Sequence, residues 1–331
     1  LSTVCFMARK TLKRSASFIL AVTILVLLLS SIAFAAEPEK KDNVYQIKTA
    51  DDLVWFSNYV SENAGKNKAA AAVLCNDIDI SGATLNPIGG DNGWGYSGIF
   101  DGQGHTISRF TYKEESNPQS GHKYALFGVI NEGAIVMNLG VSGAEVVVAA
   151  SKGGKADVYA AALAGINEGT IYNCFVKNSS VTIKSSSAPK SGVLCGYNKG
   201  TIENCFCIQS SIADKSTSKN TPPAGTLGGI AGGNDGTIKN SYTVGIACTT
   251  NTQKNHDTLY PIAPGTVQNS YYAGATGGVT SEYTGGEDKG SAWLKSDAAV
   301  TALGEYFAKD TDNKNGGYPV LKLKTTGGGV D

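Results

Sequence analysis

The sequence GINEGTIYNC, residues 165–174, sets the fold of this chain because it returns twice in nearly the same form. GYNKGTIENC spans residues 196–205, and GGNDGTIKNS spans residues 232–241. A divergent earlier copy covers residues 128–138, and a degenerate last copy covers residues 264–272. The asparagines near the end of each copy lie 35, 31, 36 and 29 residues apart: Asn138, Asn173, Asn204, Asn240 and Asn269. A repeat of this length indicates stacked supersecondary units.

The repeats have the character of strands. Each core is short, β-branched and interrupted by glycine, and none carries the 3.6-residue apolar stripe of a helix. One coil per repeat, with strands of successive coils paired in parallel about 4.8 Å apart, gives a parallel β-helix. Two polar stretches, residues 209–228 and 247–263, vary most in length and are predicted to be loops that leave the coil.

Residues at equal repeat positions become neighbours in successive coils, which predicts three columns. An amide ladder is expected at Asn173, Asn204, Asn240 and Asn269. Two residues further on, an aromatic column is expected at Phe175, Phe206, Tyr242 and Tyr271. An aliphatic column is expected at Ile171, Ile202, Ile238 and Val267. The motif glycines are expected to take positive φ at the corner, which leaves open the face that each column uses: Gly169, Gly200 and Gly236.

The first 35 residues have the pattern of a secretory signal peptide, with Met7 as the expected true start. Basic residues precede an apolar run at Phe18–Leu29, and Ala33-Phe34-Ala35 predicts cleavage before Ala36. The whole chain has 28 basic and 28 acidic residues, and removal of four basic residues with the leader leaves 24 against 28. No basic block remains that would favour nucleic acid as a partner, and no membrane span is expected in the mature chain.

Both ends of the coil are predicted to be capped, as a solenoid requires. A capping-box-like Thr49 to Asp52 precedes a helix with Leu53, Phe56 and Val60 on one face. Ser296 is expected to cap a second helix, which bears Val300, Leu303 and Phe307, and residues 317–323 form a final strand. The expected organisation is a linker (36–46) and a β-helix (47–324), followed by a tail (325–331). Within the β-helix we expect an amino-terminal cap (47–120), the repeats (121–275) and a carboxy-terminal cap (290–324).

Six cysteines follow the leader, and an even number in an exported chain permits disulfides. Cys174 and Cys205, however, share a repeat position with Ser241 and Ser270. A position that accepts serine favours a small-residue packing slot with free, buried thiols, and the disulfide alternative stays open.

The repeats and both flanks together resemble the GLUG-motif surface proteins of bacteria. The resemblance covers roughly residues 44–324, including LVWFSNYV at residues 53–60 and the closing NGGYPVL at residues 315–321. It implies a right-handed, pectate-lyase-like β-helix on an exported surface protein, expected to be Gram-positive. The motif also occurs beside the metallopeptidase domain of immunoglobulin-cleaving proteases. This chain has no H-E-x-x-H and only three histidines, so the resemblance does not imply protease activity.

Carboxylates near the amino-terminal cap are the best catalytic candidates. Asp77 and Asp79 share a strand face, and Asp101 and His105 follow in FDGQGHTI. The structural alternative, in which these side chains shape turns, is favoured by the resemblance. Residues 310–317 superficially match a calcium loop but place Lys314 at a ligand position, so a polar turn is the better interpretation.

Aromatic residues supply a binding hypothesis. Trp94, Tyr96, Tyr112 and Tyr124 would stack on sugar rings if they shared a surface, and the alternative is edge packing. His122 and His256 are expected to be solvated in polar loops. We assign no catalytic, cofactor-binding or metal-binding residue and expect no cofactor.

The sequence thus favours an exported, non-catalytic β-helix that acts as an adhesive or structural stalk for a glycan or protein ligand. Two alternatives stay open, a polysaccharide lyase or hydrolase and a spacer of a larger surface protein. The ligand, the anchor and the oligomeric state are not predicted.

Overall fold

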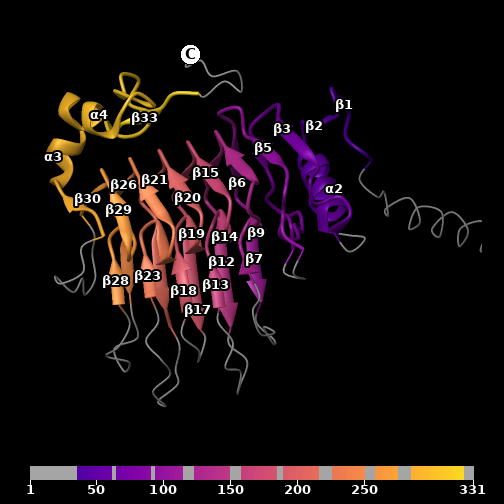
Figure 1. The fold of residues 1–331 in the computed structure, drawn as a ribbon, viewed down its shortest axis with the longest axis horizontal. Coiled ribbons are helices and arrows are strands. Elements are labelled where there is room, and N and C mark those ends of the chain that lie inside the picture. The colour runs from indigo at the N-terminus through magenta and orange to yellow at the C-terminus, as the bar shows by residue number, and fades with distance from the viewer. Residues whose placement is uncertain are drawn as a thin grey trace, which may run out of the picture. The chain divides into compact units, whose positions relative to one another are not determined.

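The fold is a parallel β-solenoid, as the repeats predicted. The computed structural model describes residues 36–61, 65–90, 94–114, 123–149, 158–184, 189–215, 226–249, 258–274 and 285–323. The expected signal peptide, the tail at 325–331, His122 and His256 lie outside these residues. The described strands form four complete coils of five strands each, which begin at β5 (Ile99–Asp101), β10 (Ile135–Met137), β15 (Thr170–Tyr172) and β20 (Thr201–Glu203). Figure 1 shows the coils stacked side by side.

Five sheets run along the solenoid, and each coil visits them in the order A, B, D, E, C. Sheet A contains β1 (Lys40–Lys41), β2 (Val44–Ile47), β3 (Ala71–Leu74), β5 (Ile99–Asp101), β10 (Ile135–Met137), β15 (Thr170–Tyr172), β20 (Thr201–Glu203), β25 (Thr237–Lys239) and β29 (Thr266–Gln268). Sheet B contains β4 (Ile78–Asp79), β6 (Thr106–Ser108), β11 (Gly140–Ser142), β16 (Phe175–Lys177), β21 (Phe206–Ile208), β26 (Tyr242–Val244), β30 (Tyr271–Ala273) and β31 (Glu287–Asp288).

The other three sheets complete each coil. Sheet D contains β7 (Thr111–Glu114), β12 (Glu145–Ala149), β17 (Ser180–Lys184), β22 (Ser211–Asp214) and β27 (Ala247–Thr249). Sheet E contains β8 (Lys123–Tyr124), β13 (Val158–Ala160), β18 (Pro189–Gly192), β23 (Thr226–Gly228) and β28 (Thr258–Tyr260). Sheet C contains β9 (Phe127–Ile130), β14 (Ala164–Asn167), β19 (Cys195–Asn198) and β24 (Ala231–Asn234).

Three boundaries differ from the sequence prediction. The expected linker at 36–46 contains β1 and most of β2, and β2 pairs with β3 as part of sheet A. The coil also begins before residue 121, because β5, β6 and β7 already pair with the strands of the next coil. The expected loops at 209–228 and 247–263 hold β22, β23, β27 and β28, and the residues between these strands lie outside the described part.

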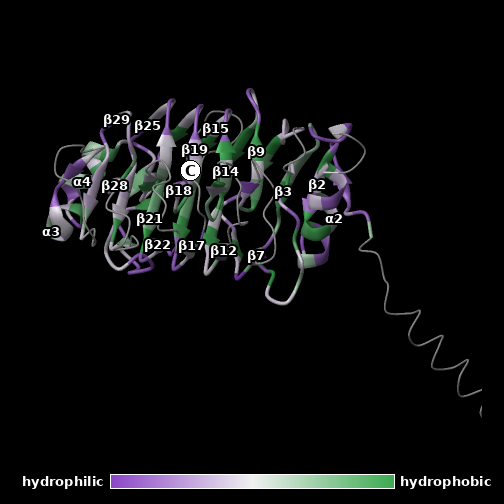
Figure 2. Cartoon of the chain, turned by 90° about the horizontal axis from the view of Figure 1, so that it is seen from below, coloured by the Kyte–Doolittle hydropathy of each residue, from purple (hydrophilic) through white to green (hydrophobic). Residues whose placement is uncertain are grey.

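The aliphatic and aromatic columns lie as predicted. Ile171, Ile202 and Ile238 stand in register and are fully buried inside the coil. The rings of Phe175 and Phe206 stack with centroids 5.2 Å apart, and those of Phe206 and Tyr242 with centroids 5.0 Å apart. Figure 2 shows apolar residues concentrated along the stacked strands.

The corner that follows sheet A is turned by asparagine rather than by glycine. The expected positive φ at Gly169, Gly200 and Gly236 is wrong. The five corner asparagines adopt it instead, with φ between 44° and 55°: Asn138, Asn173, Asn204, Asn240 and Asn269. Asparagine tolerates this left-handed conformation better than other residues with a Cβ. The motif glycines are needed because a Cβ on Gly200 or Gly236 would lie under 3.0 Å from a carbonyl oxygen of the preceding coil.

The predicted amide ladder is therefore only partial. Asn173 Nδ2 donates to Asn138 Oδ1 at 2.7 Å, whereas the amide of Asn204 is buried without a hydrogen bond. A continuous amide ladder forms instead at the first asparagine of the motif, six residues before the corner asparagine of the same coil. There Asn167 donates to Asn198 at 2.8 Å, and Asn198 donates to Asn234 at 2.7 Å.

The packing slot at Cys174 and Cys205 also has a polar function. Cys205 Sγ accepts the backbone N–H of Cys174 at 3.5 Å, and Ser241 Oγ accepts that of Cys205 at 3.1 Å. Each thiol or hydroxyl also donates to the carbonyl two residues before it, as in Cys205 to Glu203 at 3.2 Å. Cysteine and serine exchange here because both are small groups that donate and accept. All six described cysteines are free thiols, and five of them are buried.

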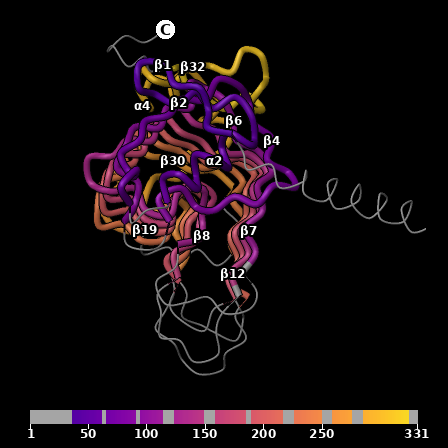
Figure 3. Tube along the Cα trace, turned by 90° about the vertical axis from the view of Figure 1, so that its right-hand side faces the viewer, coloured from indigo at the N-terminus to yellow at the C-terminus, as the bar shows by residue number. Residues whose placement is uncertain are grey.

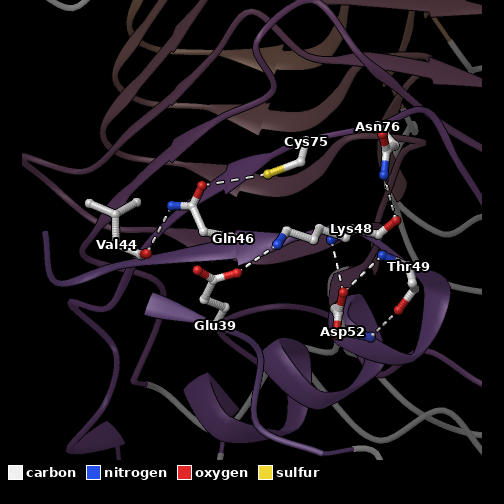
Figure 4. A network of polar contacts seen from close by, with 8 residues as sticks. All are labelled: Glu39, Val44, Gln46, Lys48, Thr49, Asp52, Cys75 and Asn76. Carbon is white, nitrogen blue, oxygen red and sulfur yellow. Dashed lines mark hydrogen bonds and ion pairs between the residues drawn. The ribbon is translucent and has the colours of Figure 1, made fainter. Parts of the chain in front are cut away.

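Helix α2 (Ala50–Ser61) closes the amino-terminal end, with Leu53, Phe56 and Val60 buried as predicted. Its capping box is confirmed: Asp52 N–H donates to Thr49 Oγ1 at 3.2 Å, and Thr49 N–H donates to Asp52 Oδ2 at 2.9 Å. Figure 4 shows how neighbouring contacts tie this turn to the first strands, with Lys48 paired to Glu39 at 2.6 Å.

The carboxy-terminal segment does more than close the last coil. Residues 290–323, here called the strap, contain α3 (Gly290–Leu294), α4 (Asp297–Leu303), β32 (Phe307–Ala308) and β33 (Val320–Leu321). Helix α3 contacts β30, and the rest of the strap runs back along the outside of sheet B. Figures 1 and 3 show the strap as the yellow segment outside the coils. Ser296 does not cap α4 with its side chain, because its hydroxyl donates to Trp293 O. Phe307 lies beyond that helix, in β32.

The strap is held by a second apolar core outside the coil. Phe206, Ile208, Tyr242 and Val244 point outward from sheet B and are buried against Leu294, Leu303 and Phe307 of the strap. Outward-facing apolar side chains of this size require cover, and this requirement explains why the segment folds back.

Candidate functional site

The carboxylates suggested as catalytic do not gather in one cleft. Asp77 is exposed and accepts the backbone N–H of Thr106 at 2.8 Å, with the His105 ring at 3.3 Å. Asp79 forms an ion pair with Arg109 and accepts the Ser81 N–H at 3.0 Å. Both side chains therefore hold turns and neighbouring strands in place, as expected if these aspartates are structural rather than catalytic.

Asp101 is also engaged in structure. It is 2% exposed, and Oδ1 accepts both the Gln103 N–H at 2.9 Å and Asn138 Nδ2 at 3.0 Å. The Gln103 side chain donates to its other oxygen. A carboxylate this enclosed continues the corner ladder of Asn138 and Asn173 toward the amino-terminal end.

The calcium-like loop is organised by its first aspartate. Asp310 accepts the backbone N–H groups of Lys314, Asn315 and Gly317 at 2.7–2.8 Å. Burial acts to raise the pKa of this carboxyl, but these three hydrogen bonds and the nearby positive charge of Lys177 outweigh it and lower the pKa. Within the described ranges, no three His, Cys, Asp or Glu side chains come together as a metal site.

The four aromatic residues considered for sugar stacking do not share a surface. Tyr96 and Tyr124 are buried in the core, and Tyr112 packs edge-on against Tyr124 at 5.3 Å. Only Trp94 is largely exposed, at 46%. Edge packing therefore accounts for Tyr96, Tyr112 and Tyr124, and the four rings do not form the shared stacking surface that the hypothesis required; Trp94 alone has the exposure that stacking on a sugar needs.

A groove of about 430 Å³ opens between the strap and sheet B, and we call it the strap groove. The coil side is lined by Gln103, Gly104, His105, Asn138, Asn173, Phe175, Lys177 and Phe206. The strap side is lined by Lys309, Asp310, Thr311, Asp312, Lys314, Val320, Leu321 and Leu323. Its size falls within the roughly 300–1,000 Å³ typical of small-molecule sites.

Lys177 is the unusual residue of this groove. Its Nζ lies 4.8 Å from the centre of the Phe175 ring and 5.4 Å from that of Phe206. No described carboxylate forms an ion pair with it, although Asp310 is near enough to influence its charge. Burial lowers the pKa of Lys177, and Asp310 opposes this shift.

The other lysines of the strap groove already have partners. Lys309 pairs with Asp297 at 2.9 Å, and Lys314 pairs with Asp312 at 2.9 Å. The groove therefore combines an aromatic wall with Lys177, the one lysine of its lining that forms no ion pair with a described residue.

A second, shallower hollow lies at the corner between sheets B and D. It is lined by Asn178, Ser179, Ser180, Gln209, Ser210, Ser211, Gly245 and Ala247. Its lining offers hydroxyl and amide groups and contains no acid or base. Such a surface can form hydrogen bonds with a ligand but cannot supply proton transfer.

Sequence reasoning missed Lys177, although the repeat carries a signal for it. Lys177 stands in register with Ile208, Val244 and Ala273, all of them apolar and buried under the strap. A lysine in such a column departs from the pattern. Without knowledge that the strap covers this face, the departure could not be interpreted.

Comparison with known proteins supports the fold and little more. No protein-family profile matches the chain. A protein of Evansella cellulosilytica, provisionally named a Gly-rich membrane protein, is 33% identical over 147 residues, which is 44% of this chain. The chain spans only 16% of the length of that relative.

A crystal structure from Bacteroides ovatus, provisionally named an immunoglobulin A1 protease, has the same fold. It matches with a TM-score of 0.55 over 88% of this chain and 96% of its own, at 19% sequence identity. At this identity the likeness establishes the β-solenoid and carries no activity. Among the residues that the structure describes, no helix is both long and apolar enough to cross a membrane.

Proposed function

We propose that this chain is an exported β-solenoid that binds a glycan or protein ligand on its outer face without transforming it. The observation that carries this proposal is the state of the candidate acids. Asp77, Asp79 and Asp101 each accept a hydrogen bond from a backbone N–H. Asp79 and Asp101 also bond to the side chains of corner residues, Arg109 and Asn138. An acid or base engaged in this way is poorly placed to exchange a proton with a substrate.

The hollows of the described surface agree with this proposal. The corner hollow is lined by serine and amide side chains, and the strap groove holds an aromatic wall with lysines. The stacked coils with their internal ladders give a rigid support for such surfaces. The expected signal peptide supports export, and the name of the longer relative supports a place at the cell envelope.

The chain can also serve as one module of a longer surface protein, because the relative extends far beyond the matched 147 residues. In that setting the solenoid is a spacer as well as a binding surface. We propose this role alongside ligand binding.

The test uses the chain without residues 1–35, incubated with neutral and acidic polysaccharides. We expect retention on at least one immobilised glycan, with no new reducing ends and no ultraviolet absorbance from unsaturated sugars. Turnover that Asp77→Asn or Asp101→Asn abolishes would establish an enzyme. Neither turnover nor retention would leave the spacer role alone.

A further inference from the structure

Lys177 occupies a place that the solenoid otherwise fills with apolar side chains. The strap packs over Ile208 and Val244, which hold the equivalent positions in the next two coils. At Lys177 the strap does not pack against the sheet in this way, and the strap groove lies there instead. In the preceding coil, the residue in register with Lys177 is Ser142 of β11. The cation therefore stands at the boundary between a covered apolar face and a polar one.

The aromatic column ends at the same boundary. Phe175 is the last ring of the stack, and the residue in register with it in the preceding coil is Gly140. The half-buried Phe175 ring leans over Gly140, where a Cβ would lie under 3.0 Å from it. One wall of the groove thus offers an aromatic ring directly beside the Lys177 ammonium.

The charges of the groove fit one anionic group. Lys309 and Lys314 are paired with carboxylates, and Asp310 is engaged by three N–H groups. The half-buried Lys177 ammonium forms no ion pair with a described residue, although Asp310 acts on its charge from a greater distance, and a partly buried charge without a direct partner is unfavourable. A doubly charged phosphate would lack a second cation, and a neutral ligand would leave Lys177 unpaired.

We infer that the strap groove binds a sugar residue that carries one carboxylate, a uronic acid. Its carboxylate accepts hydrogen bonds from Lys177 Nζ, its ring lies against Phe175 and Leu323, and its hydroxyls face His105 and Gln103 at the open side. This inference rests on the proposed function and names the ligand class for one of its surfaces.

The test compares two pairs of monosaccharides that differ only in the carboxylate. Methyl glucuronide and methyl galacturonide are titrated into the chain without residues 1–35, beside methyl glucoside and methyl galactoside, and binding is followed by NMR. We expect at least one uronide to bind, about tenfold or more tightly than its neutral counterpart, because a hydrogen bond to a charged group is lost in the latter.

Lys177→Ile places the residue of the next coil at this position, so the variant should fold and lose uronide binding about tenfold or more. Lys184→Met removes an exposed lysine of β17 as the matched control and should bind like the parent chain. If K177I fails to melt cooperatively, Lys177→Met replaces it. Equal binding of uronide and neutral sugar, no binding of either uronide, or unchanged binding by the Lys177 variants would overturn the inference.

These failures are distinct from failure of the proposed function. If neither uronide binds but another glycan is retained and is insensitive to the Lys177 variants, the chain is still a binding solenoid and the uronide site is overturned. Turnover of any polysaccharide would overturn the non-catalytic proposal itself.

Discussion

Replacing Asn198 tests whether the inner amide ladder holds successive coils together. Asn198 is fully buried, accepts Asn167 Nδ2 at 2.8 Å, and donates to Asn234 Oδ1 at 2.7 Å. Asn198→Ala removes both ladder hydrogen bonds, with two longer donations to Gly200 O at 3.3 Å and Thr237 O at 3.4 Å, and leaves the buried Asn234 Oδ1 without its donor.

The magnitude follows from these contacts. Two side-chain hydrogen bonds contribute about 0.5–1.5 kcal/mol each, and stranding a buried acceptor costs about 1–3 kcal/mol. We therefore expect the free energy of unfolding to fall by about 2–6 kcal/mol. Urea denaturation followed by circular dichroism, on the chain without residues 1–35, measures this change.

The matched control is Asn178→Gly in the same coil. Asn178 is exposed with φ of 50°, a conformation that glycine adopts without strain, so the change should stay within about 1 kcal/mol. A loss below about 1 kcal/mol for N198A, or equal losses for the two variants, would refute the idea that the ladder joins the coils.

Three further predictions test the corners, the strap and the thiols. Gly200→Ala should destabilise the chain by about 1–3 kcal/mol or more, because its Cβ would press on Gly169 O. Gly245→Asn should be tolerated, since Asn178 and Gln209 already adopt positive φ at the same corner between sheets B and D in the two preceding coils. Thermal melts that rank these two variants the other way would contradict this expectation. The folded-state pKa of Asp310 is lowered, so its contribution to stability is present above its ordinary pKa of about 4 and is lost as the pH falls through the folded value. The hydrogen-exchange protection of the Lys314, Asn315 and Gly317 amides, measured relative to the intrinsic exchange rate at each pH, should therefore fall in acid, and Asp310→Asn should remove this pH dependence. In the chain without residues 1–35, which lacks Cys5, a thiol reagent at pH 8 should modify Cys75 quickly and the five buried thiols only after unfolding, because burial raises the pKa of Cys195 to about 12 and that of Cys248 to about 11. Rapid labelling of more than one thiol would show that the coil opens.

The sequence alone determined the coil, because a repeat with β-branched cores and glycine at fixed spacing buries its apolar residues by stacking equivalent strands in successive coils. The columns at Ile171 and Phe175, and the capping box at Thr49, depend on contacts between equivalent or nearby residues. Patterns of this kind can be predicted from the sequence because the residues that make the contacts are identified by their spacing.

Only the tertiary structure decided which asparagine forms the continuous ladder. Asn198 and Asn204 look equivalent in the motif, yet the first points into the ladder and the second turns a left-handed corner. The left-handed residue resets the alternation of side chains, and sequence cannot show whether asparagine or glycine takes that conformation.

The strap groove also depended on the fold. Leu323 and Lys177 are far apart in sequence, and they line one groove because the outward-facing aromatic column draws the strap back across sheet B. A long-range contact of this kind leaves no periodic signal. The lysine that breaks an apolar column is recognised only once its cover is known.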